Sequence, residues 1–73
     1  MPGIHFGLAK AYKAQGQNGK AMDAALRSVE LDPSFAEAHY LLGQLYRDRN
    51  DAERARQEFE TFRTLKYGAP PSR

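Results

Sequence analysis

The sequence matches itself when it is shifted by 34 residues. The identical pairs are His5 and His39, Leu8 and Leu42, Tyr12 and Tyr46, Ala21 and Ala55, and Leu31 and Leu65. The pairs of similar kind are Phe6 and Tyr40, Ala9 and Gly43, and Gly16 and Asn50. Most of these positions are apolar or small, as repeated packing of one structural unit requires. A fixed period of this length predicts helical hairpins stacked in a row, each burying one face on the next.

Apolar residues recur at helical spacing in four stretches, at about residues 3–15, 18–31, 35–49 and 52–66. The residues that form these apolar faces are Ile4, Leu8, Ala11 and Tyr12; Ala21, Met22, Ala25, Leu26 and Val29, which are expected to point inward; Ala38, Leu41, Leu42, Leu45 and Tyr46; and Ala55, Phe59, Phe62 and Leu65. No alternating pattern indicates a strand. Because the connections are short, neighbouring helices should be antiparallel. The predicted fold class is all-α, with four helices in tandem antiparallel hairpins.

Residues that break or cap helices separate these stretches. The breaks are Gly16, Asp32-Pro33, Asn50 and Tyr67-Gly68. We expect Asn18 to cap the second helix and Asp51 to cap the fourth. Ser34, with Glu37 three residues on, is typical of a capping box at the start of the third helix.

Size and composition exclude several classes of protein. A chain of 73 residues makes one small domain. The net charge of +2 comes from interleaved acids and bases, so we expect no nucleic-acid partner. No apolar run approaches the roughly 20 residues that span a bilayer, and the first residues as given do not have the pattern of a signal peptide. The sequence has no cysteine and gives no cellular location.

The two units resemble the tetratricopeptide repeat (TPR) family over nearly the whole chain. The motif residues of the first unit are His5, Leu8, Ala9, Tyr12, Ala21, Ala25, Ser28 and Pro33. Those of the second are His39, Leu42, Gly43, Tyr46, Ala55, Phe59 and Phe62, and residues 36–62 match best. The histidines replace a bulkier residue, Ala25 replaces a large apolar one, and Tyr67 replaces the closing proline. The resemblance implies one domain at 1–67, with repeats at about 2–34 and 36–67, and a flexible tail at 68–73.

The resemblance also implies a function. In this family the first helices of the hairpins line a concave groove that receives a peptide. The groove candidates here are Phe6, Lys10, Lys13, Glu37, Tyr40, Leu41, Gln44 and Arg47. Aromatic side chains with flanking cations suit a peptide that carries apolar and acidic residues. We therefore expect a scaffold that binds a protein or peptide partner.

One alternative to this groove remains open. The basic residues could be ordinary solvated surface while Phe6 and Tyr40 pack between repeats, which would leave a purely structural oligomerisation module. Some family members clamp a carboxylate with Lys and Asn, and Phe6, Lys10 and Leu41 occupy the matching positions here. We therefore expect no carboxylate clamp of the kind that binds chaperone tails.

The sequence contains no arrangement typical of an enzyme. His5 and His39 lie one repeat apart, about 8–10 Å in stacked helices, which is too far to share one metal ion. No Asp, Glu or Cys is placed to complete a set, so packing is the better interpretation of both histidines. Residues 16–20 end in Gly-Lys but lack the spacing of a phosphate-binding loop. We expect no catalytic residue, no metal and no cofactor.

The two ends of the predicted stack expose apolar residues. Terminal repeats usually need polar faces, and three or more repeats are usual. The candidates for self-association are Ile4, Phe59, Phe62 and Leu65. We expect the chain either to form a homo-oligomer through these ends or to be a piece of a longer repeat array.

Overall fold

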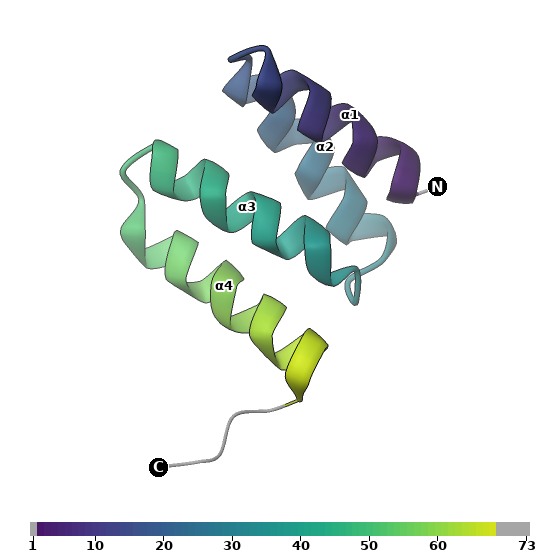
Figure 1. Ribbon diagram of the computed structural model, residues 1–73, viewed down its shortest axis with the longest axis vertical. Coiled ribbons are helices and arrows are strands. Elements are labelled where there is room, and N and C mark those ends of the chain that lie inside the picture. The colour runs from purple at the N-terminus through teal and green to yellow at the C-terminus, as the bar shows by residue number, and fades with distance from the viewer. Residues whose placement is uncertain (1, 69–73) are drawn as a thin grey trace.

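The computed structural model describes residues 2–68 and shows two helical hairpins stacked side by side (Figure 1). The helices are α1 (Pro2–Ala14), α2 (Asn18–Leu31), α3 (Ala36–Asp48) and α4 (Ala52–Tyr67). Helix α1 packs on α2, α3 packs on α4, and α2 packs on α3 to join the hairpins. The predicted all-α architecture is confirmed. None of these helices has the length and apolar character needed to cross a bilayer.

The breaks between helices have the backbone conformations that the sequence predicts. Gly16, Asn50 and Gly68 have positive φ angles of 77°, 64° and 87°. These values lie in or near the left-handed region, which Gly adopts without strain and Asn tolerates better than most residues. Gly16 and Asn50 stand at matching positions of the two repeats, so each hairpin turns in the same way. Residues 69–73, most of the predicted tail, lie outside the described residues.

One of the three predicted caps is present. The side chain of Asp51 accepts a hydrogen bond of 3.3 Å from the backbone N–H of Arg54. Asn18 instead lies inside α2, where Gln17 is the N-cap and its side chain makes no capping bond.

The predicted capping box at Ser34 is wrong because a neighbouring carboxylate competes for the same groups. The backbone N–H and the hydroxyl of Ser34 both bond to Oδ1 of Asp32, at 3.1 and 2.7 Å. This local turn holds Ser34 outside the helix, and an ionised acceptor two residues away forms strong hydrogen bonds. Phe35 becomes the N-cap of α3 and has no side-chain bond to offer.

The core lies where α1, α2 and α3 meet. Its buried residues are Ala9, Ala21, Met22, Ala25, Leu41, Leu42 and Leu45. Five residues predicted on the apolar faces lie mostly outside it, because their side chains are exposed: Ile4, Leu8, Ala11, Leu26 and Leu65. Leu8, for example, is 44% exposed. Leu42 has the same place in the second repeat as Leu8 but is 0% exposed. The difference arises because α2 covers α3, whereas none of the described helices covers the outer face of α1.

Gly43 allows the closest approach within the second hairpin. A Cβ atom at this position would lie 2.5 Å from the ring of Phe59. That is well inside normal carbon contact distance, so the ring packs directly on the backbone of α3. The absence of a side chain at Gly43 therefore allows the two helices of this hairpin to approach closely.

Candidate functional site

Phe6 and Lys10 form the part of the predicted groove that α1 contributes. The ring of Phe6 packs on Phe35, with centroids 4.9 Å apart and an interplanar angle of 56°. The ammonium nitrogen of Lys10 lies 5.2 Å from the centre of the Phe6 ring. Phe35 was not among the sequence candidates, although it begins the third predicted helical stretch. Its contact fixes Phe6 against the turn between α2 and α3.

Tyr40 and Arg47 form the part that α3 contributes. The ring of Tyr40 lies 5.3 Å from Phe59 and 4.9 Å from Phe62, in tilted contacts. Arg47 lies over Phe59, with its guanidinium carbon 6.0 Å from the ring centre. Tyr40 nevertheless remains 43% exposed. The result is an aromatic side chain that is held from behind and open to solvent in front.

The remaining groove candidates have different environments. Leu41 is only 6% exposed and belongs to the core cluster, so the prediction that it lines the groove is wrong. The helical period points it toward α2, on the apolar stripe that packs the two hairpins together. Glu37 forms an exposed ion pair of 3.5 Å with Lys66 of α4. Lys13 and Gln44 are half-buried.

Phe59 and Phe62, two of the self-association candidates, contact Tyr40 of their own hairpin. Both are half-buried. The other two candidates, Ile4 and Leu65, are exposed. The exposed apolar surface at the ends is therefore smaller than the sequence pattern suggests.

His39 has an acidic partner that sequence reasoning missed. Its Nδ1 atom lies 2.8 Å from Oε1 of Glu58, and its Nε2 atom lies 2.8 Å from the carbonyl oxygen of Pro33. A carbonyl oxygen only accepts, so Nε2 is the donor in that bond. The His39 side chain is 12% exposed. His39 therefore ties α3 to α4 and to the preceding turn, which agrees with a packing role.

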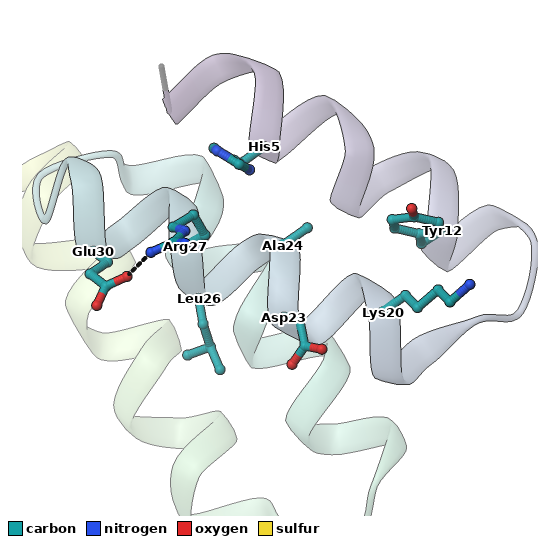
Figure 2. A pocket seen from close by; sticks show the side chains of 8 residues that line it. All are labelled: His5, Tyr12, Lys20, Asp23, Ala24, Leu26, Arg27 and Glu30. Carbon is teal, nitrogen blue, oxygen red and sulfur yellow. Dashed lines mark hydrogen bonds and ion pairs between the residues drawn. The ribbon is translucent and has the colours of Figure 1, made fainter.

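The histidine of the first hairpin lacks this partner. Ala24 occupies the position that matches Glu58, and a furrow of about 480 Å³ opens between α1 and α2 beside His5. Figure 2 shows His5 and Tyr12 on α1 above the α2 side chains, with the Arg27–Glu30 ion pair of 3.0 Å at one end. Charges of both signs line this furrow, so it has no electrostatic preference for a ligand. In residues 2–68, no three His, Asp or Glu side chains are placed to hold a metal ion.

A comparison with protein families identifies the repeat. The sequence model described as the TPR repeat matches residues 9–49, which is more than half of the chain. The chain belongs to the TPR family. No curated protein sequence gave a significant match. TPR repeats generally form scaffolds for protein–protein interaction and are not catalytic.

The family match ends before α4. It covers the second half of α1 and all of α2 and α3. The predicted resemblance to a TPR protein is thereby confirmed, while the boundaries of the individual repeats stay a prediction. The side chains of α4 also differ from those of its counterpart α2 more than the side chains of α3 differ from those of α1.

Proposed function

We propose that this TPR domain binds a protein or peptide partner on the surface formed by Phe6, Lys10 and Lys13 of α1 and by Tyr40, Gln44 and Arg47 of α3. The observation that carries the proposal is Tyr40, which is 43% exposed although two phenylalanine rings hold it in place. An aromatic side chain that is already fixed loses little conformational entropy when it binds. Such residues are frequent energetic anchors of interfaces.

The charges of this surface favour a partner with acidic residues. Helix α1 carries two lysines and no Asp or Glu. On α3, Glu37 is paired with Lys66, whereas no described residue forms an ion pair with Arg47. The preferred partner is a segment that places an apolar side chain on Tyr40 and carboxylates near the cations. Because Phe6, Lys10 and Leu41 occupy the clamp positions, the proposal does not include a carboxylate clamp.

The test compares two variants that change the net charge by the same amount. Lys10→Glu with Lys13→Glu reverses the proposed surface, and Lys20→Glu with Arg27→Glu reverses exposed cations on the outer side of α2. Each immobilised protein is incubated with the same extract, and bound proteins are quantified by mass spectrometry. We expect the α1 variant to lose partners that the α2 variant keeps. Equal retention by both folded variants, as judged by circular dichroism, would refute the proposal.

A second candidate function is assembly of copies of the chain, and the outer face of α1 favours it. Ile4 is 60% and Leu8 44% exposed, whereas their counterparts Ala38 and Leu42 in α3 are 0% exposed. Burying such a face against another helix would remove apolar area from water. Sedimentation velocity of the wild type and of Leu8→Gln over a range of concentrations tests this. A wild type that stays monomeric at high micromolar concentration excludes it.

A further inference from the structure

The end face of α4 differs in character from the matching face of α2. On α2, Met22 and Ala25 are buried in the cluster that contains Leu41 and Leu45 of α3, and Val29 packs against it. The positions that match Met22 and Val29 in α4 are Arg56 and Arg63. A second apolar helix like α3 would therefore leave two guanidinium groups facing an apolar surface, which is unfavourable. This end of the stack requires a different kind of neighbour.

The face contains a shallow hollow of about 360 Å³. Its apolar lining comes from Ala52, Ala55 and Phe59, and its charged lining comes from Arg47, Arg56, Glu60 and Arg63. Three cations thus surround an aromatic ring, with one carboxylate among them. The ring of Phe59 is fixed between Tyr40, Arg47 and the backbone of Gly43. The hollow therefore combines a rigid apolar floor with an excess of positive charge.

Little inside the described chain neutralises that charge. Arg56 pairs with Glu53 at 2.7 Å, but both side chains are about two-thirds exposed. An ion pair so exposed is weak and exchanges readily with another carboxylate. Neither Arg47 nor Arg63 forms an ion pair with any described residue. Arginine binds carboxylates through two parallel hydrogen bonds, so this arrangement suits an acidic ligand.

We propose that the end face of α4 binds an acidic amphipathic helix of a partner protein. A helix is the appropriate shape because α3 covers the matching face of α2 in the same chain. Its apolar side chains would lie on Phe59, Ala52 and Ala55, and its carboxylates would meet Arg56 and Arg63. A second copy fits poorly, because α1 offers Lys10 and Lys13 but no acidic residue. Arg47 and Phe59 also border the surface around Tyr40, but Arg56 and Arg63 lie outside that surface, so variants at these two arginines test this proposal separately.

The test uses a fluorescein-labelled peptide of about 18 residues, long enough to form a helix, with leucines on one face and glutamates on the other. Binding is measured by fluorescence anisotropy with the full chain. We expect saturable binding, and loss of about tenfold or more in affinity for Arg56→Glu with Arg63→Glu. The same variant should gain affinity for a peptide with lysine in place of glutamate. Lys20→Glu with Arg27→Glu, which changes the charge equally on α2, should leave the affinity for the acidic peptide within about twofold.

Several results would overturn the proposal. One is equal binding of the acidic peptide by the wild type and the α4 variant. Another is equal binding of a scrambled peptide that has the same composition but no apolar face. A third is tight binding of an oligothymidine without binding of the acidic peptide, which would make the arginines a phosphate-binding surface. Circular dichroism of each variant ensures that a lost interaction does not reflect a lost fold.

Discussion

The first hairpin has Ala9 and Ala25 at the positions where the second has Gly43 and Phe59. Both pairs fill the space between two helices, but they divide the volume differently. In the first hairpin, two small side chains share this space. In the second hairpin, a single large ring lies directly against the backbone. Only the second arrangement provides a fixed ring behind Tyr40. The same backbone register therefore gives a plain packing unit in one hairpin and an aromatic surface in the other.

The largest difference in stability between the hairpins should appear when the matching leucines, Leu8 and Leu42, are each replaced by alanine. Leu42→Ala should lower the free energy of unfolding by about 3 kcal/mol, because it leaves a cavity in a fully buried site. Leu8→Ala should cost about 1 kcal/mol or less, because its side chain is already half in water. Urea denaturation of the monomeric protein measures both. Equal costs would show that the two hairpins are packed alike.

The Gly43–Phe59 contact should give the next largest effect on stability. Gly43→Ala should cost about 1–2 kcal/mol, since its methyl group meets the Phe59 ring. In a Phe59→Ala background the same change should cost nothing or stabilise by up to about 1 kcal/mol, because alanine favours helix. A thermal-unfolding double-mutant cycle gives the coupling between the two sites. If Gly43→Ala has the same effect in both backgrounds, the close contact has no energetic role.

The histidine partners should give an effect of about 1 kcal/mol. Glu58→Ala removes the bond to His39 and should destabilise by about that amount. Ala24→Glu places a carboxylate at the matching position beside His5 and should stabilise by about 0.5 kcal/mol or less. Urea midpoints at constant pH measure both changes. A destabilising effect of Ala24→Glu would mean that the furrow in Figure 2 cannot reproduce the His39 arrangement.

Effects of similar size should come from the matching N-caps. Asp51→Ala should cost about 1 kcal/mol because it removes the acceptor for the Arg54 N–H. Gln17→Asp introduces the equivalent acceptor before α2 and should gain about 0.5 kcal/mol. Melting temperatures from circular dichroism provide the measurement. An unchanged or lower melting temperature for Gln17→Asp would show that the turn at Gln17 prevents the side chain from reaching the helix.

Local chemistry allowed much of the fold to be predicted from the sequence. The period of 34 residues, the helical spacing of apolar residues and the left-handed turns at Gly16 and Asn50 all follow from the chain itself. The groove candidates of α1 and α3 were predicted as a surface, and all except the buried Leu41 are half-buried or exposed. The capping box predicted at Ser34 was wrong because two local motifs compete for this residue, and its polar groups bond to Asp32.

Contacts between neighbouring helices determined the burial and charge of each site, which the 34-residue period alone does not give. Leu8 and Leu42 are the same residue in the same register, yet one is exposed and the other buried, because among the described helices only α3 has another helix packed on that side. The His39–Glu58 contact joins residues on different helices, so it becomes visible only when α3 and α4 are placed together. The positive hollow at the end of α4 arises in the same way. A repeat fixes which positions are equivalent, but burial and charge depend on what lies beside each copy.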